Sequence, residues 1–299
     1  MSFGVNSFGI GSFGAPTNSA TTLSVSADNT SSYTVRSTVS ADTTTNYTLL
    51  SAVAVSASNI NSYLISNFDY RIVPTGDSNA SGRGSFNQTN SVTSAYLYNN
   101  SGNVVPLVDP YDGGSGQTYA ALDDGVSPGG SYVQHLADLF DSAGKSVLFI
   151  PANKGGSQAL DWVTTSAGTK YEALKNRVNS AGGDGVDLVL LIHLGTNDAN
   201  SSVSQATFKS RIETFVGNLN ADFPLAKKYL QKIHHFSSAP AGAVDAIRAG
   251  VDDVLSGSSG CLRGADLEGI TTNIHYGQTG VPSTCTSELN EVALRTFSA

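Results

Sequence analysis

From residue 67 onward, short apolar runs alternate with segments whose apolar residues recur at helical spacing. Short apolar runs bounded by turn residues predict buried strands, and helical spacing predicts amphipathic helices between them. The predicted strands are Tyr70–Pro74, Val147–Pro151, Val186–Ile192 and Tyr229–Phe236, and the predicted helices are Tyr132–Phe140, Tyr171–Val178, Thr207–Leu219, Val244–Leu255 and Ser287–Phe297. This alternation predicts an α/β fold in which helices cover both faces of a parallel sheet.

The first 66 residues carry a different pattern, made of two sets of repeats. Three Ser-Phe-Gly pentapeptides cover residues 2–16, and the segment Val25–Tyr33 recurs as Val39–Tyr47 and Val55–Tyr63. Each longer unit places a β-branched or aromatic run beside polar turn residues, which predicts a short strand, a turn and a second strand. One unit is too small to bury its apolar side, so stacking between units or chains is expected. A flexible Ser/Thr linker is the alternative interpretation.

The two patterns divide the chain into three parts. Residues 1–20 are interpreted as a Gly/Phe-repeat anchoring segment, and residues 21–66 as a short β-repeat stalk or docking module. Residues 67–299 are expected to form the α/β domain. Because the repeats cannot bury themselves alone, a homo-oligomer is favoured over a monomer.

Composition narrows the classes of partner. Only 13% of the residues are charged, and the net charge is −8. Phosphate binding needs clustered Lys and Arg, so nucleic acid is not expected as a partner. No window approaches the ~18–20 apolar residues of a membrane span, and residues 1–20 lack the pattern of a signal peptide. We therefore expect neither a nucleic-acid nor a membrane partner.

The chain has two cysteines, Cys261 and Cys285. A disulfide and a pair of buried thiols are both compatible with their positions. No spacing of His, Cys, Asp or Glu matches a metal site, so no metal is expected.

Polar loops follow three of the predicted strands. Gly76-Asp-Ser-Asn79 follows the first strand, Asn153-Lys-Gly-Gly-Ser157 the second and Gly195-Thr-Asn-Asp198 the third, while His275 precedes the last helix. Loops at the carboxyl ends of parallel strands lie at one edge of a sheet, where sites form. A serine hydroxyl attacks only when a neighbouring base, usually His, takes its proton, and the oxyanion then needs aligned N–H donors. These loops together predict a serine hydrolase site.

The order of these blocks resembles the SGNH (GDSL-type) hydrolase family. The stretch Gly76–Gly84 is similar to the Gly-Gln-Ser-Asn-x-x-Gly-Arg block of its carbohydrate-esterase branch, which includes sialate O-acetylesterases and acetylxylan esterases. Ile150–Ser157 with Trp162 resembles the second block of that branch, and Tyr171 opening a helix fits as well. The resemblance covers residues 67–299 and implies a three-layer, flavodoxin-like parallel sheet.

The resemblance also implies roles for individual residues. Ser78 would be the nucleophile and His275 the general base. The oxyanion hole would comprise the N–H groups of Ser78 and Gly156 (or Gly155, because the doublet makes the alignment ambiguous) and the side chain of Asn197. No cofactor or metal is implied.

Some of these residues also have purely structural interpretations. Gly155-Gly156 is also typical of a plain turn, and Asn197-Asp198 of a helix cap. Of the remaining histidines, one falls in a predicted helix, one at a strand end behind the site and two on a predicted strand: His135, His193, His234 and His235.

The sequence departs from the family pattern just before His275. The family usually carries an Asp two or three residues before its histidine, but Thr272-Asn-Ile-His275 has no carboxylate. Asn273 can fix the ring tautomer but cannot offset its charge, and losing the acid of a triad costs about 10⁴-fold in turnover. Three explanations stay open: Asp266 or Glu268 supplies the acid, the site works as a Ser–His dyad, or catalysis has been lost.

The functional expectation is a serine esterase that removes O-acetyl groups from carbohydrate. The N-terminal repeats resemble those of bacteriophage tail-fibre and virion-attachment proteins, which often form homotrimers. This resemblance implies a virion or extracellular location, contacts with other virion proteins through residues 1–66, and bacterial surface polysaccharide as the source of the acetylated glycan. The alternative is a catalytically weak or inactive domain that decorates a particle or binds glycans. A lipase or thioesterase is less favoured because the loops Ser81–Gln88 and Asp109–Tyr119 are polar.

Overall fold

The computed structural model describes residues 65, 67–88, 92, 94–109, 122, 129–279 and 281–298, and the backbone of residues 21–27, 32–39 and 54–56. The chain divides into two compact units, Met1–Leu64 and Ile65–Ala299. The first unit contains the repeats, and the second contains the alternating strands and helices.

In the described part of the first unit, three strands form an antiparallel sheet in chain order. They are β1 (Thr21–Ala27), β2 (Ser32–Val39) and β3 (Ala54–Ser56). β1 and β2 contain the two ends of the repeat Val25–Tyr33. The pentapeptides at 2–16 and most of the second repeat lie outside the described residues.

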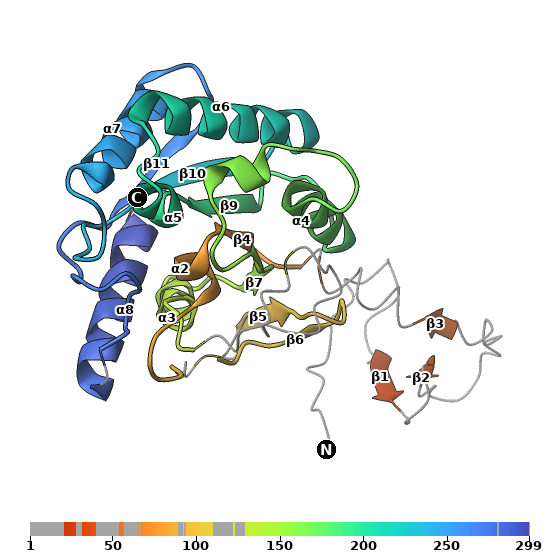
Figure 1. Cartoon of the computed structure of the whole chain (residues 1–299). Coiled ribbons are helices and arrows are strands. Elements are labelled where there is room, and N and C mark those ends of the chain that lie inside the picture. The colour runs from red at the N-terminus through yellow and green to blue at the C-terminus, as the bar shows by residue number, and fades with distance from the viewer. Residues whose placement is uncertain are drawn as a thin grey trace. The chain divides into compact units, whose positions relative to one another are not determined.

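The second unit is built around one sheet with the strand order β11-β10-β9-β4-β7-β5-β6, and β8 pairs with β4 (Figure 1). All of its strand pairs are parallel except β5–β6. The strands are β4 (Tyr70–Gly76), β5 (Ala95–Tyr98), β6 (Val104–Pro106), β7 (Val147–Phe149), β8 (Ala152–Asn153), β9 (Leu188–His193), β10 (Lys227–Lys232) and β11 (Leu262–Asp266).

The strand order identifies the topology. Without the β5–β6 hairpin, the strands β7-β4-β9-β10-β11 follow the order 2-1-3-4-5 of flavodoxin-like sheets. In such sheets the order reverses beside the first strand, and ligands bind at the carboxyl ends of the strands on either side of that point. Here that point lies between β4 and β9. The predicted flavodoxin-like α/β fold is therefore confirmed.

Helices cover both faces of the sheet (Figure 1). α4, α6 and α7 pack on one face with Val73 and Leu190, whereas α3 and α8 pack on the other with Ile72 and Val189. Because successive residues of each central strand point to opposite buried faces, these strands are continuous apolar runs in the sequence. The helices are α2 (Ser78–Ser81), α3 (Val133–Ser142), the 3₁₀ turn η2 (Ala159–Trp162), α4 (Lys170–Ser180), α5 (Thr196–Asn200), α6 (Gln205–Asp222), α7 (Ala243–Ser256) and α8 (Pro282–Ser298).

The sheet differs from the sequence prediction near its edges. β10 ends at Lys232, so His234 and His235 lie in the loop after the strand and not on it. β5, β6 and β11 were not predicted. β6 has no buried residue, and only two of the five residues of β11 are buried, so neither edge strand carries the apolar pattern of a central one.

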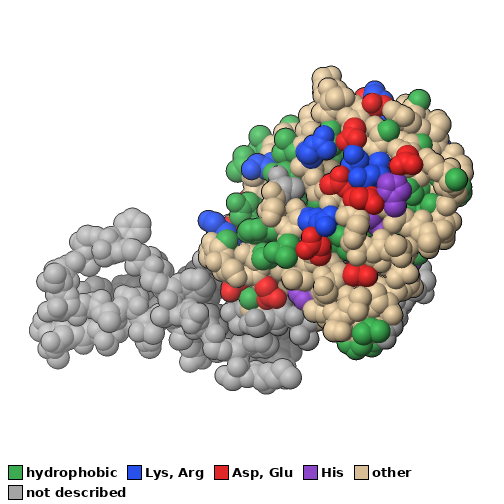
Figure 2. Space-filling model, turned by 90° about the vertical axis from the view of Figure 1, so that its left-hand side faces the viewer, with side chains coloured by type: hydrophobic (Ala, Val, Ile, Leu, Met, Phe, Trp, Pro, Cys, Tyr) green, Lys and Arg blue, Asp and Glu red, His purple; other side chains and the backbone are tan. Residues whose placement is uncertain are grey.

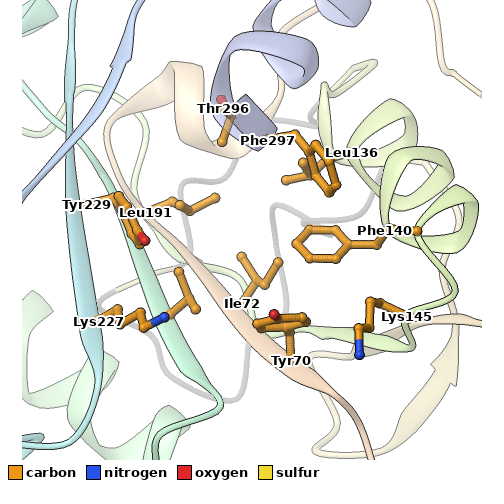
Figure 3. A pocket seen from close by; sticks show the side chains of 12 residues that line it. Tyr70, Ile72, Leu136, Phe140, Lys145, Leu191, Lys227, Tyr229, Thr296 and Phe297 are labelled. Carbon is orange, nitrogen blue, oxygen red and sulfur yellow. The ribbon is translucent and has the colours of Figure 1, made fainter. Parts of the chain in front are cut away.

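An apolar cavity of about 320 Å³ lies between α3, α8 and the sheet (Figure 3). Tyr70 and Lys227, the first residues of β4 and β10, contribute to its wall, and Figure 3 shows Phe140 and Ile72 pointing into it. Ser78 follows the opposite end of β4. The cavity therefore belongs to the packing between helices and sheet and not to the edge that carries the polar loops.

Candidate active site

Ser78 is the first residue of α2, directly after β4. The chain turns there because Gly76 has φ +131° and lies against β9, where a β-carbon would overlap the carbonyl oxygen of His193. The N–H of Asp77 donates to that carbonyl at 3.0 Å. Only glycine allows this close approach of the two strands, so the position of Ser78 is set by the backbone of the sheet.

The side chain of Asp77 connects the turns that follow β4 and β9. Its carboxylate accepts hydrogen bonds from the N–H of Asn79 at 3.0 Å, as the N-cap of α2, and from the N–H of Thr196 at 3.3 Å. The carboxyl group is fully buried, and this burial outweighs the hydrogen bonds and raises its pKa to about 7. The carboxyl group of Asp77 thus connects the turns after β4 and β9, the two strands between which the strand order of the sheet reverses (the switch point).

His275 lies in the loop between β11 and α8, and its ring reaches Ser78. Nε2 of His275 lies 2.8 Å from Oγ of Ser78, and Nδ1 lies 3.1 Å from Oε1 of Gln278. The amide oxygen accepts only, so Nδ1 carries the proton and Nε2 accepts from the serine hydroxyl. The pKa of His275 is lowered overall. Burial is the main cause and the charge of Arg83 adds to it, whereas the hydrogen bond to Gln278 acts in the opposite direction. The pair has the geometry of a nucleophile beside its general base.

Asn79, the neighbour of Ser78, fixes the backbone on both sides of His275. Its Nδ2 donates to the carbonyl of Ile274 at 3.0 Å, and its Oδ1 accepts from the N–H of Tyr276 at 3.2 Å. We call the turn after β4 that carries Ser78 the serine turn, and residues 267–281, between β11 and α8, the histidine loop. The buried amide of Asn79 therefore aligns the histidine loop with the serine turn. Neither Asn79 nor Gln278 was singled out from the sequence. The sequence features that could have indicated them are the Asn directly after the serine and the Gln three residues after His275.

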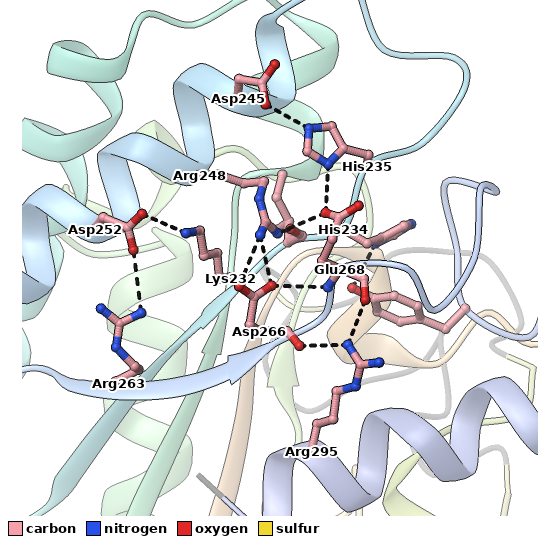
Figure 4. A network of polar contacts seen from close by, with 12 residues as sticks. Lys232, His234, His235, Asp245, Arg248, Asp252, Arg263, Asp266, Glu268 and Arg295 are labelled. Atoms are coloured by element: carbon pink, nitrogen blue, oxygen red, sulfur yellow. Dashed lines mark hydrogen bonds and ion pairs between the residues drawn. The ribbon is translucent and has the colours of Figure 1, made fainter.

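The structure assigns Asp266 and Glu268 to other partners (Figure 4). Both oxygens of Asp266 accept from Nη2 of Arg248, and Oε2 of Glu268 lies 2.7 Å from Nδ1 of His235. Nδ1 of His275 instead faces Gln278. The interpretation that Asp266 or Glu268 folds back onto His275 is therefore wrong.

These carboxylates belong to a surface network of charged groups. Figure 2 shows acidic and basic side chains mixed around a histidine on this face. Arg295 donates to the backbone carbonyls of Asp266 and Glu268, at 3.0 and 2.7 Å. The side chain of Asn273 donates to the carbonyl of Gln278 at 3.0 Å, while the described hydrogen-bond partners of the His275 ring are Gln278 and Ser78. The network holds the start of the histidine loop without supplying an acid.

The loop after β8 is tied to the serine turn. The N–H of Lys154 and the hydroxyl of Ser157 both donate to the carbonyl of Gly76, at 2.9 and 3.1 Å. Nε1 of the buried Trp162 donates to Oγ of Ser157 at 3.1 Å. Gly156 lies in the tight turn between Lys154 and Ser157, with φ +76°. The glycine doublet therefore forms a turn, and this turn also lies beside the residues that carry Ser78.

Asn197 lies within α5 at the end of β9. Its Nδ2 donates to the carbonyl of Ser157 at 3.1 Å, so it connects the second and third polar loops. The N-cap position of α5 is Gly195, and Asp198 accepts from the N–H of Ala159 at 2.9 Å and pairs with Arg211. Asn197 and Asp198 thus tie loops together rather than cap the helix.

The other histidines make structural contacts. His234 donates through Nε2 to the carbonyl of Asn273 at 2.6 Å, and its Nδ1 lies 2.9 Å from the hydroxyl of Tyr276. His193 is fully buried behind the site, 3.4 Å from the same hydroxyl, and burial lowers its pKa to about 3. His135 on α3 contacts the side chain of Gln88 at 3.2 Å. None of the three bonds to Ser78 or His275 among the described contacts.

Both cysteines are free thiols, with Cys285 buried and Cys261 partly buried. Within the described ranges, no group of three or more His, Cys, Asp and Glu side chains is arranged to hold a metal ion. None of the helices described here is long and apolar enough to span a membrane.

Comparison with known proteins places this site in a family. A solved structure of a protein from Arabidopsis thaliana is similar to the chain with a TM-score of 0.60 and 16% identity, covering 78% of this chain and 99% of that one. This similarity shows the shared fold. NanS (TM-score 0.40, 14% identity, 71% of this chain and 78% of that one) and a carbohydrate esterase of family 3 from Talaromyces cellulolyticus (0.42, 14%, 56% and 90%) are also similar.

No curated protein matches the chain in sequence. The family model described as "Carbohydrate esterase, sialic acid-specific acetylesterase" matches residues 72–282, which include the serine turn, both connecting loops and His275. The match covers more than half of the sequence, and the chain therefore belongs to this family of esterases.

Proposed function

We propose that the protein is a serine esterase that removes O-acetyl groups from carbohydrate. The observation that carries the proposal is the 2.8 Å contact between Oγ of Ser78 and Nε2 of His275, at the switch point of a carbohydrate-esterase fold. A buried amide, Asn79, aligns the two loops that bear these residues. The arrangement supplies two things that acyl transfer needs, a nucleophile and a base in contact with it.

In the first half of the reaction, Oγ of Ser78 attacks the acetyl carbonyl while its proton passes to Nε2 of His275. The tetrahedral intermediate then collapses, the proton moves from His275 to the sugar oxygen, and the deacetylated sugar leaves an acetyl-serine. In the second half, His275 takes a proton from water, which attacks the acetyl group and releases acetate. The proton returns to Oγ of Ser78, so the enzyme is restored without a cofactor.

Three donors are proposed for the oxyanion. The N–H groups of Ser78 and Gly156 have no acceptor among the described residues, which leaves both available to a substrate oxygen. Asn197 uses one amide hydrogen on Ser157, and its second hydrogen is the third candidate donor. Losing one such donor typically costs about 10²–10³-fold in kcat.

The substrate class follows from the family and from the charge near the site. The family description names sialic acid, an acidic sugar, as the substrate. Arg83 lies near enough to His275 for its positive charge to lower the pKa of the ring. An arginine at this place would also attract the carboxylate of an acidic sugar. We propose an O-acetylated glycan, with acidic sugars as the first candidates.

We further propose that residues 1–66 attach the enzyme to a virion, where a homo-oligomer, such as a trimer, acts on bacterial surface polysaccharide outside the cell. The repeats support this proposal, because they need neighbours to bury their apolar residues. The non-enzymatic alternative is a decoration protein that only binds glycans. Its support is the neutral Gln278 where a triad would have a carboxylate.

The test is hydrolysis of p-nitrophenyl acetate by the wild type, Ser78→Ala and His275→Ala, with circular dichroism to verify folding. We expect release of p-nitrophenol by the wild type and a fall of at least about 10³-fold in both variants. A matched control, Ser142→Ala, removes an exposed serine whose hydroxyl donates to the carbonyl of Asp138 within α3, and it should keep full activity. Equal background rates in the wild type and Ser78→Ala would reject the esterase, and glycan binding by calorimetry would then test the alternative.

A further inference from the structure

We propose that Gln278 is the positioning residue of the site and holds the ring of His275 in the place of the missing acid. The inference rests on the proposed function, since it assigns His275 as the base. Its direct basis is the 3.1 Å contact between Oε1 of Gln278 and Nδ1 of His275, opposite the 2.8 Å contact between Nε2 and Ser78. The ring is thus held from both sides.

A tight turn brings Gln278 back onto the ring three residues after it. Gly277 has φ +71°, and a β-carbon there would lie only 3.0 Å from Sγ of Cys285 and from Leu289, so the backbone conformation and the tight packing both favour glycine. The N–H of Gly277 donates to the carboxylate of Glu288 on α8 at 2.7 Å. The Asn273 side chain donates to the carbonyl of Gln278. The turn is therefore fixed before the Gln278 side chain is placed.

The carboxylate of a triad orients the histidine ring and stabilises its protonated form, and an amide oxygen can perform only the first of these functions. It accepts a hydrogen bond from Nδ1–H and so keeps the lone pair of Nε2 directed at the hydroxyl of Ser78. It carries no charge, so it does not stabilise the imidazolium that forms during the reaction. This explains how the site keeps its geometry without the Asp that the family pattern places before the histidine.

The charged groups around the ring do not replace that acid. Arg83 opposes protonation of His275, and His234, after β10, also interacts with it repulsively when both are charged. Glu288 accepts from the N–H of Gly277, and the buried Asp77 accepts from the N–H groups of Asn79 and Thr196. Gln278 is thus the polar side chain that the structure places on Nδ1.

The test compares Gln278→Ala and Gln278→Glu with the wild type, using kcat and KM for p-nitrophenyl acetate from pH 5 to 9. We expect Gln278→Ala to lower kcat by about 10–100-fold with little change in KM, because the ring loses its orientation. Gln278→Glu should keep kcat at or above the wild-type value, and it should move the acidic limb of the pH–rate profile to higher pH by about one unit. The reason is that a carboxylate favours the protonated ring and so raises its pKa. Gln205→Ala is the matched control, since Gln205 is exposed on α6 and its side-chain amide donates to Asp253.

A second measurement does not depend on activity. Nitrogen NMR of the imidazole rings, assigned with His275→Ala, reports which ring nitrogen of His275 carries the proton and where it titrates. We expect the Nδ1–H tautomer in the wild type, a tautomer mixture in Gln278→Ala and a raised pKa in Gln278→Glu. An unchanged tautomer and pKa in both variants would overturn the inference. If Ser78→Ala and the wild type are equally inactive, the proposed function fails, and the ring titration still decides the role of Gln278.

Discussion

The serine turn and the histidine loop meet at one contact, but they are held in different ways. The serine turn follows a central strand, and it is bound by backbone hydrogen bonds from Asp77 to β9 and from Lys154 to Gly76. The histidine loop follows an edge strand. The side chains of Asn79, His234 and Glu288 hold it, together with backbone hydrogen bonds from Ser85 and Ser237, none of which belongs to the central strands. One half of the site is part of the sheet, whereas the other half is attached to it.

This difference leads to different expectations for substitutions. Changes in the backbone of the serine turn, as at Gly76, disturb the packing of β4 against β9, so they should reduce stability and activity together. Changes in the contacts of the histidine loop should reduce activity more than stability, because the sheet does not depend on them. Substitutions on either side can test this contrast.

The largest effect is expected from Gly76→Ala. The new β-carbon would overlap the carbonyl of His193, and φ +131° is unfavourable for alanine. We expect a loss of about 3 kcal/mol or more in the free energy of unfolding, measured by urea denaturation, and a loss of esterase activity. The control is Gly144→Ala, which has φ +69° but open space around it and should cost only about 1 kcal/mol. Equal losses in the two variants would contradict the close approach of the strands.

The next effect is expected from Asn79→Ala, which removes both contacts to the backbone around His275. We expect kcat to fall about 100-fold, since a small displacement of a catalytic group has this effect, with a stability loss of about 1–3 kcal/mol. The control is Asn218→Ala, which removes a similar amide bond to the carbonyl of Val163, away from the site. If both variants lose stability but keep wild-type kcat, the histidine loop does not depend on Asn79.

The contrast also explains how far the sequence predicted the site. The central strands and the loops after them were predictable because buried parallel strands are continuous apolar runs and their carboxyl ends share one edge. Ser78 and His275 were predicted by residue type and order, and the structure brings them together. The edge strands β6 and β11 were not predicted, because their half-exposed residues lack that pattern.

The contacts of the histidine loop were not predictable in the same way. Gln278 reaches the ring only because Gly277 turns the chain and Glu288 holds that turn. Asn79 reaches Ile274 across 195 positions of sequence. Such contacts depend on how β11 and α8 pack, which no local pattern encodes. Asp266 and Glu268 were candidates by proximity in sequence, and Arg248 and His235 bind them instead.

A smaller effect concerns Asp77 and pH. Its pKa of about 7 in the folded protein, against about 3.9 in the unfolded chain, means that the folded state keeps the proton between these values. Stability should therefore fall as pH rises through this range, by at most about 1.4 kcal/mol per pH unit. We expect Asp77→Asn to remove this contribution to the slope between pH 5.5 and 6.5 in urea titrations.

The control for Asp77 is Asp69→Asn, because Asp69 lies at the surface and the hydrogen bonds that it accepts from Ser146 lower its pKa. It stays ionised at these pH values in both states, so the slope between pH 5.5 and 6.5 should match the wild type. A wild-type slope in Asp77→Asn as well would mean that Asp77 is ionised in the folded protein.

The smallest effect is expected in the surface network beneath the histidine loop. His235 bonds to Glu268 at 2.7 Å and to Asp245 at 2.9 Å, and the bond to Glu268 is the main cause that raises its pKa. Its stabilisation is therefore present below about pH 6.5 and is lost as pH rises through the raised pKa. Because the ring is half-exposed, solvent screening keeps the expected loss in His235→Gln to about 0.5 kcal/mol at pH 5.5, and to nearly nothing at pH 9.

The same variant decides how much the histidine loop depends on this network. Arg248 pairs with the carboxylates of Asp266 and Glu268, and Arg295 donates to the backbone carbonyl of Glu268. Losing His235 therefore leaves the start of the histidine loop anchored. We expect kcat to change less than about twofold, and 1 M salt to remove the stability difference because it screens exposed charges. A tenfold loss of kcat would show that the surface network, rather than Asn79, sets the position of His275. The surface contacts would then position the histidine loop, and Asn79→Ala should lower kcat less than His235→Gln does.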